Sequence, residues 1–294
     1  MKTITILFLA AAFAASTAPT LAQTVVGTVV IAHGADEAWN AQVRRVIAEV
    51  RGTGGPVEAS FLMGPEAATH RFQDVVARMA ATGAREIVVV PLLVSSHSGH
   101  YDQIRYLVGE LDSIPESMKH HLHMAGIERP TASVKLRLTR AIDNSPDAAR
   151  VLAERARTLA QSPAQQALFL VGHGPNSIED LAQWMRNLRE IADTVRAVTG
   201  FRDVRTGLVQ DDAPAAVRAE AVARVRDLIE LQAAATGRPV VVVPVLISKG
   251  RLTSETLPAD LAGLPISYSG DALLPHPSLA RWIEARVRET TENR

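Results

Sequence analysis

The sequence predicts an α/β protein of two similar lobes, each with a four-stranded parallel sheet flanked by helices, and a cleft between the lobes. Two observations carry this prediction. The strongest strand signals are continuous apolar runs, such as TVVGTVVIA (24–32) and REIVVVPLLVS (85–95), and strands buried on both faces of a parallel sheet have this character. The same order of elements then occurs a second time, with ALFLVG (167–172) and RPVVVVPVLIS (238–248) in the matching places.

Helical patterns alternate with these strands, which is the order of an α/β fold. Gly83 and Gly237 stand where two of the helices are expected to end. The long helices are expected at 37–51, 67–82, 178–199 and 215–235. Shorter strands are expected in VEASFLM (57–63) and VRTGLVQ (204–210). A last strand and a closing helix are expected in each lobe, at 121–128 and 132–142 in the first and at 265–273 and 278–289 in the second.

The repeat sets the predicted domain boundaries. Residues 24–144 form the first lobe, a helical region at 145–163 joins the lobes, and residues 164–294 form the second lobe as a degenerate copy.

The first 22 residues have the three-part plan of a secretory signal peptide: Lys2, an apolar block at 4–15, and small residues up to Ala22. A membrane anchor is the weaker alternative, because the block is shorter than the ~20 residues that a bilayer span needs. We therefore expect cleavage after Ala22, a periplasmic or secreted protein, and no membrane insertion afterwards.

Composition excludes several classes of function. Lys and Arg (31) balance Asp and Glu (31), so no electrostatic argument favours nucleic acid or an anionic membrane surface. Cysteine is absent, which excludes disulfides, thiol catalysis and thiolate metal sites. The available metal ligands are His, Asp, Glu and Met.

Histidines follow two neighbouring strands at the points where these strands end. His33 follows the first strand, and His97 and His100 lie in the segment SSHSGH after the third. Ligands of parallel α/β sheets bind beyond the carboxyl ends of the strands, so these side chains are expected to face one crevice. Two or three convergent imidazoles can hold cobalt, nickel, iron or zinc with open coordination positions. Gly34 and Gly99 would let the backbone turn sharply beside the ligand.

Each histidine also has an ordinary structural interpretation. A single histidine at a strand end is more often a hydrogen-bonded loop residue, and His97 could equally point to water. His-Gly recurs at His173, but the matching loop SKGRLTSETLP (248–258) has no histidine, which favours a remnant of the duplication. The cluster in KHHLHMAG contains His120, His121 and His123, and for it a solvated strand is preferred over an accessory metal site. His70 and His276 are expected to be structural. A hydrolase that uses Ser95, Ser96 or Ser98 is a further alternative, but the spacing of these residues does not favour it. The sequence contains no G-x-S-x-G, Walker or H-E-x-x-H motif.

Three segments together resemble a known family: VVIAHGADE, IVVVPLLVSSHSGHYDQI and GDALLPHPSLARWI. Their order and spacing resemble the sirohydrochlorin chelatase family, the cobalt- or iron-inserting class II tetrapyrrole chelatases, in its two-lobed form. The resemblance covers essentially the whole chain after the predicted signal peptide.

The resemblance implies a site and a substrate. His33 and His100 would be the metal ligands and proton acceptors, since a neutral imidazole with an ordinary pKa of about 6.5 can do both. His97 would be an auxiliary ligand. The tetrapyrrole would contact Gly34, Met63, Ser95, Ser96 and Gly99. The metal would be a substrate, Co²⁺ first and Fe²⁺ or Ni²⁺ as alternatives, with no organic cofactor, and assembly into a homo-oligomer is left open.

The chain departs from the family at three places. Met63 stands where the family commonly has a glutamate, Ala35 replaces a serine, and the loop before His100 has an additional residue. Glu66 lies close enough in sequence to Met63 to be a substitute carboxylate. The family's reaction is expected in the cytoplasm, whereas this chain carries an export signal. These departures keep a second hypothesis open, a non-catalytic periplasmic protein that binds a metal or a tetrapyrrole on the same fold.

Overall fold

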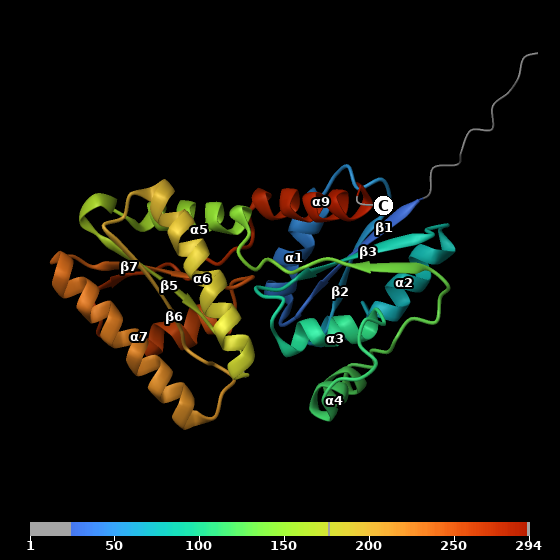
Figure 1. The fold of residues 1–294 in the computed structure, drawn as a ribbon, viewed down its shortest axis with the longest axis horizontal. Helices are drawn as coiled ribbons and strands as arrows, with labels where there is room; N and C mark the ends of the chain where they lie inside the picture. The colour runs from blue at the N-terminus through green and yellow to red at the C-terminus, as the bar shows by residue number, and fades with distance from the viewer. Residues whose placement is uncertain (1–24, 176, 293–294) are drawn as a thin grey trace, which may run out of the picture.

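The computed structural model describes residues 25–175 and 177–292, which form two α/β lobes side by side (Figure 1). The predicted signal peptide, residues 1–22, lies outside the described residues. In the part of the chain that is described, no helix combines the length and the apolar character that a membrane span requires.

The first lobe holds a fully parallel sheet with the strand order β2-β1-β3-β4. Its elements are β1 (Val26–Ala32), α1 (Glu37–Glu49), β2 (Val57–Phe61), the 3₁₀ turn η1 (Pro65–Ala68), α2 (Phe72–Ala81), β3 (Glu86–Leu92), α3 (Gly99–Leu107), α4 (Glu116–Met124) and β4 (Lys135–Leu138).

The second lobe repeats this arrangement with the strand order β6-β5-β7-β8, again fully parallel. From the connecting helix onwards, its elements are α5 (Pro146–Leu159), the 3₁₀ turn η2 (Pro163–Gln165), β5 (Ala167–Gly172), α6 (Ile178–Thr199), β6 (Asp203–Leu208), α7 (Ala215–Thr236), β7 (Val240–Pro244), the π-helical turn η3 (Leu252–Thr256), α8 (Leu257–Asp260), β8 (Ile266–Ser267) and α9 (Pro277–Glu292).

The predicted fold class is therefore confirmed: two four-stranded parallel sheets, each flanked by helices. All residues of β1, β3, β5 and β7 are buried, as their continuous apolar sequences predict. The repeat extends to the register, because Pro91 pairs with Ile31 in one sheet and Pro244 with Val171 in the other. Both prolines lie beyond the stretch that pairs with the fourth strand, so no ladder hydrogen bond to that strand is lost.

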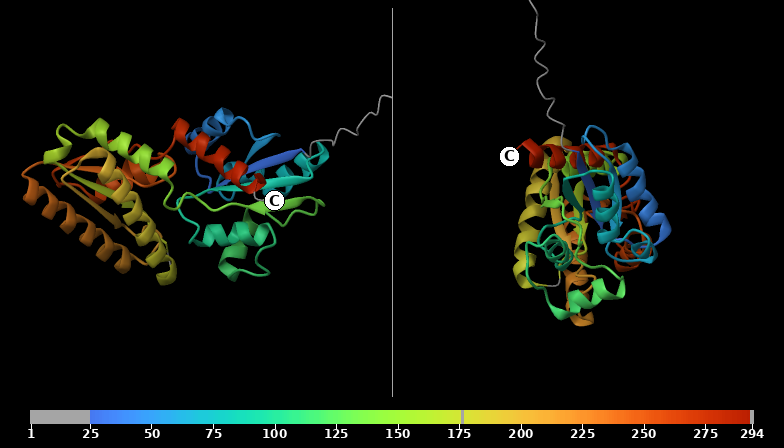
Figure 2. Two further views of the ribbon diagram at one scale, coloured as in Figure 1. Left: turned by 45° about the horizontal axis from the view of Figure 1, so that its top comes forward. Right: turned by 90° about the vertical axis from the view of Figure 1, so that its right-hand side faces the viewer.

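The two lobes exchange their closing helices (Figures 1 and 2). Helix α5 follows the first lobe in sequence but packs on α6 and β7 of the second, whereas α9 packs on α1 and β3 of the first lobe. One hydrophobic core consequently runs through both lobes and includes Val30, Leu152, Leu170 and Trp282. The apolar faces that these helices cover belong to the other half of the chain, so the lobes are not independent units.

Two predicted elements in the first lobe are wrong. The segment 121–128 is not a strand, because α4 runs to Met124, and the predicted helix at 132–142 contains β4 instead. In H-L-H-M only Leu122 is buried, and a single buried residue fits one face of a helix as well as one face of a strand. His120, His121 and His123 are therefore exposed on a helix, and the strand geometry expected for His121 and His123 does not exist.

Candidate metal centre

His33 lies directly beyond the carboxyl end of β1, where the chain turns at Gly34 with φ +86°. Asn40 is fully buried in α1 and bonds both the backbone N–H and the carbonyl of Ala35, which fixes the loop. The His33 carbonyl accepts a hydrogen bond from the backbone N–H of Met63 (2.8 Å). The end of β1 is thus held from two sides.

His100 is in the first turn of α3, which begins immediately after the loop that follows β3. The Ser98 hydroxyl accepts from the backbone N–H of Tyr101 and caps this helix. A Cβ on Gly99 would stand 2.9 Å from Met118 Cε, so glycine lets α3 pack closely against α4. The short loop and the tight packing place His100 over the end of β1.

The two imidazoles contact each other, with ring centroids 4.6 Å apart and planes at 79°. His33 Nδ1–H donates to the Gly34 carbonyl (2.7 Å), which can only accept. Gln103 donates through Nε2 to the Met118 carbonyl (2.8 Å), so its Oε1 accepts from His100 Nδ1–H (2.8 Å). Both rings are therefore fixed as the tautomer in which Nε2 carries a free lone pair, the form that binds metal.

Burial keeps both imidazoles neutral. Burial, followed by the neighbouring His100, lowers the pKa of His33 to about 4. Burial also lowers the pKa of His100, although the hydrogen bond to Gln103 opposes this. Both histidines are thus unprotonated at neutral pH and available to a cation.

We expect Co²⁺ affinity to stay nearly constant from pH 8 down to about pH 6 and to fall at lower pH, as the pH approaches the lowered pKa values of His100 and His33. Protons compete with the metal only below the ligand pKa, and for free imidazole this competition begins at about pH 6.5. Calorimetric titrations at several pH values measure this. A tenfold loss of affinity between pH 7 and pH 6 would contradict the depressed pKa values.

Two ligands from the protein leave most of the coordination sphere open. Within residues 25–175 and 177–292, no group of three or more His, Asp or Glu side chains gathers closely enough to hold an ion. Glu66 does not add a third ligand here, because Arg44 pairs with its carboxylate. Burial raises the pKa of Glu66, but hydrogen bonds from Arg44 and Asn40 and the charge of Arg44 together outweigh it and lower that pKa. Met63 is half-buried and packs against the apolar core of the first lobe.

The serines before His100 have their hydroxyls engaged inside the protein. Ser95 is buried and accepts from the His97 backbone N–H, and buried Ser96 donates to the Asp143 carboxylate (2.8 Å). Ser98 is the cap of α3. These bonds shape the loop, and substrate contact by Ser95 and Ser96 stays a prediction.

The groups that hold His97 differ from those that hold His33 and His100. Its Nε2 lies 3.4 Å from Arg140 Nη2, and its carbonyl accepts from Trp184 Nε1 of the second lobe (2.7 Å). The structure therefore brings two of the three predicted histidines into contact, and the role of His97 as auxiliary ligand stays a prediction.

The remaining predicted structural histidines are tied to their surroundings. His70 lies in the turn before α2 and packs edge-on against Phe61, at a centroid distance of 5.7 Å. His276 Nε2 is 2.9 Å from Glu154 of α5, which links the two exchanged helices.

Sequence reasoning missed Gln103, and it interpreted His173 as a remnant of the duplication. Gln103 stands three positions after His100 on one helix face, a spacing at which side chains meet, so its role could have been inferred. His173 contacts Trp184 (ring centroids 5.5 Å), the residue that bonds the loop before His100. Both His173 and Asp212 are close enough to influence the pKa of His33 and of His100.

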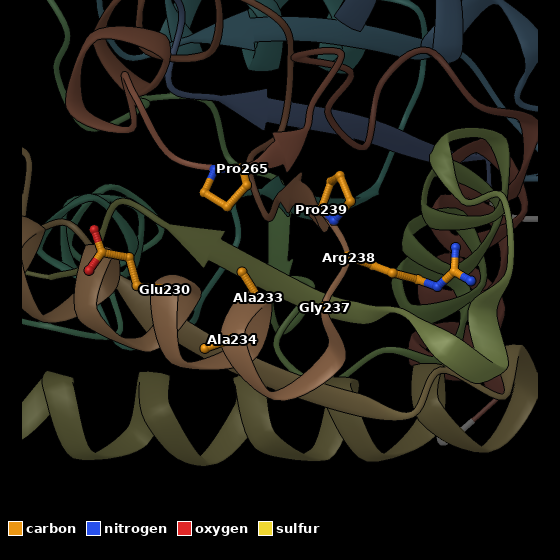
Figure 3. Close-up of a pocket in the computed structure, with 7 residues that line it drawn as sticks. All are labelled: Glu230, Ala233, Ala234, Gly237, Arg238, Pro239 and Pro265. Atoms are coloured by element: carbon orange, nitrogen blue, oxygen red, sulfur yellow. The ribbon is translucent and has the colours of Figure 1, made fainter.

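A surface depression elsewhere in the second lobe offers no comparable chemistry. It lies at the amino end of β7 and is lined by Glu230, Ala233, Ala234, Gly237, Arg238, Pro239 and Pro265. Figure 3 shows the two charged side chains, Glu230 and Arg238, on opposite sides of it. The histidines lie at the other edge of the sheets, beyond the carboxyl ends of the strands.

Comparison with known proteins agrees with the fold and the repeat. The CbiX family profile matches residues 27–159 and again residues 167–290. SirB from Bacillus subtilis, solved with Fe³⁺, is similar in structure at a TM-score of 0.63, with 19% identity over 91% of this chain and 96% of SirB.

DR2241 from Deinococcus radiodurans, described as a multi-domain protein with structural similarity to chelatases, has a TM-score of 0.56 and 19% identity. The match covers 90% of this chain and 54% of that protein. A search of curated proteins found no match. The two matched repeats span most of the chain, which therefore belongs to the CbiX family, in the two-lobed form that its sequence resembles.

Proposed function

We propose that this protein inserts a divalent metal ion, Co²⁺ in the first instance, into sirohydrochlorin or a closely related tetrapyrrole. One observation carries the proposal: His33 and His100 form a pair of neutral imidazoles, each held by its Nδ1–H with Nε2 free. Two neutral imidazoles bind a divalent ion without cancelling its charge. The ion can therefore transfer from them to the four nitrogens of the ring.

The chain's own residues divide the task. His33 and His100 present the ion, and the hydrogen bonds at their Nδ1 atoms prevent the rings from turning away. Gln103 acts through His100 as a positioning residue. The end of β2 offers no free carboxylate among the described residues, because Met63 is apolar and Glu66 is bound to Arg44. The end of β2 therefore supplies no acceptor for the ring protons, and this role falls to His33 and His100, as the resemblance implies, or to a group on another element.

The test is an insertion assay with the protein lacking residues 1–22, sirohydrochlorin and Co²⁺, followed by the absorption change of the ring. We expect a rate well above that of the same mixture without protein. A rate equal to the spontaneous one would contradict the proposal. Fe²⁺ and Ni²⁺ in place of Co²⁺ would then rank the metals, and the Fe³⁺ in the SirB structure makes iron the first alternative.

The second candidate is a non-catalytic protein that binds a metal or a tetrapyrrole. The apolar Met63 favours it, because the position offers no proton acceptor. Saturable binding of Co²⁺ and of the ring, with no acceleration of insertion, is the result that would identify this function.

We further propose export of the protein, on the basis of the signal-like sequence at 1–22. The mature protein would then begin at Gln23 and be recovered from the periplasm or the medium, which the mass of the purified protein tests.

A further inference from the structure

The second lobe repeats the turn that carries His33. β5 ends at Gly172, and His173 and Gly174 follow, with a φ of +93° at Gly174 that matches the +86° of Gly34. The turn faces the first site, since Trp184 contacts the His173 ring and donates to the His97 carbonyl of the other lobe. His173 is therefore on the same side of the molecule as His33 and His100, on the opposite lobe.

Two buried polar atoms beside this turn have no hydrogen-bond partner in the described chain. They are His173 Nδ1 and Gln210 Oε1. Gln210 Oε1 would stand 2.6 Å from a Cβ on Gly174, so it lies against the residue next to His173. By strand register, Gln210 occupies in the second lobe the place that Met63 has in the first, two residues beyond the pairs Gly172–Leu208 and Ala32–Phe61.

These two atoms are complementary. An Nδ1–H on His173 is a donor and Gln210 Oε1 is an acceptor, either directly after a small movement or through one water. This is the relation that Gln103 has to His100 in the first lobe, where the donor and acceptor are 2.8 Å apart. With Nδ1–H bonded to Gln210, Nε2 of His173 would be free to act as a base. Nδ1 is buried, but the side chain as a whole is partly exposed.

His173 is not positioned to share the ion held by His33 and His100. Among the described residues these three side chains do not gather into a metal-binding group. A flat macrocycle between the lobes would instead have His33 and His100 on one face and His173 on the other.

We propose that His173 accepts the pyrrole protons on the face of the tetrapyrrole opposite to the incoming metal, with Gln210 as its positioning residue. The inference rests on the proposed function and assigns the proton acceptor that the end of β2 lacks. His173 is partly exposed, so solvent can take the protons on from it.

Two N–H bonds of the ring break, and both electron pairs stay on nitrogen and enter bonds to the metal, while His33 and His100 release it. Each proton in turn passes to His173 Nε2 and then to water, so M²⁺ and the ring with its two N–H groups give the metal complex and two protons, with no change in total charge. His173 returns to its starting state, and no redox partner is needed.

The test compares His173→Ala and His173→Gln with the wild type in the Co²⁺ insertion assay, together with Co²⁺ affinity and sirohydrochlorin affinity. We expect both variants to bind Co²⁺ and the ring within about threefold of wild type and to lose about 10²–10⁴-fold in insertion rate. Added imidazole should restore part of the rate of His173→Ala, which a structural defect would not allow. Gln210→Leu should lower the rate less and leave metal affinity unchanged.

His120→Ala is the matched control, because this exposed histidine lies on α4 and has no part in the site. It should retain wild-type values. Full insertion activity in both His173 variants would overturn the inference, as would a tenfold or greater loss of Co²⁺ affinity, which would make His173 a ligand. Failure of the wild type to accelerate insertion would overturn the proposed function, and the inference with it.

Discussion

Replacing either His33 or His100 with alanine is expected to weaken Co²⁺ binding by about 100-fold or more and to reduce insertion to the spontaneous rate. Each ring supplies one of only two ligands that the described chain brings together, and no third side chain is close enough to compensate. Loss of an outer hydrogen-bond partner alone typically costs 10–100-fold in metal affinity, so loss of the ligand itself should cost at least as much. Calorimetric titration and the absorption assay measure the two effects separately.

Gln103→Leu and His123→Ala are the graded controls for this prediction. Gln103→Leu keeps both ligands but removes the acceptor that holds His100 Nδ1–H, so a loss of about 10–100-fold is expected. His123→Ala changes an exposed histidine of α4 and should bind Co²⁺ like the wild type. Unchanged affinity in both His33→Ala and His100→Ala would show that the metal binds elsewhere.

Gly34→Ala is expected to lower the free energy of unfolding by about 2–5 kcal/mol. A Cβ at this position would stand 2.2 Å from the Met63 carbonyl oxygen, a backbone atom that cannot rotate away. The φ of +86° adds the cost of a left-handed conformation in a residue with a side chain. Relief of the clash requires the ends of β1 and β2 to separate, so the variant should also lose metal affinity. Urea unfolding and Co²⁺ titration measure the two effects.

Gly109→Ala separates these two causes. Gly109 has the same φ of +86°, but a Cβ there would meet no atom within 4 Å. Only the backbone cost of about 1–2 kcal/mol is expected, with metal binding unchanged. Equal destabilisation in Gly34→Ala and Gly109→Ala would mean that the loop at Met63 yields freely and that the end of β1 is not held as described.

The sequence predicts the central strands and the contact between His33 and His100 well, for a clear physical reason. Strands such as β1 and β7 are buried on both faces, so their composition alone identifies them, and the sheet edge then follows from parallel topology. Parallel topology alone therefore predicts that His33 and His100 lie close together. α4 and β4 were predicted wrongly because each buries few residues, and a short half-exposed segment has no decisive period.

The role that we propose for the second lobe could not be inferred from the sequence, for a different reason. His173 has no histidine partner within its own lobe, and the sequence contains no sign of how the lobes face each other. That relation depends on packing between distant segments, such as the hydrogen bond from Trp184 to the His97 carbonyl. The role proposed for Gln210 could not be inferred from the sequence either. It depends on the buried oxygen beside Gly174 and not on any motif.

The exchange of α5 and α9 also sets the order in which the chain can fold as it is made. The first lobe leaves the ribosome with one face of its sheet covered only in part by α1, because α9, which packs on α1 and β3, is synthesised only with residues 277–292. At about 5–20 residues per second, the roughly 150 residues after the first lobe take on the order of ten seconds to appear. During that interval the newly synthesised first lobe must remain loosely packed or be bound by a chaperone. The two repeats therefore complete their folding together, only after α9 has been synthesised.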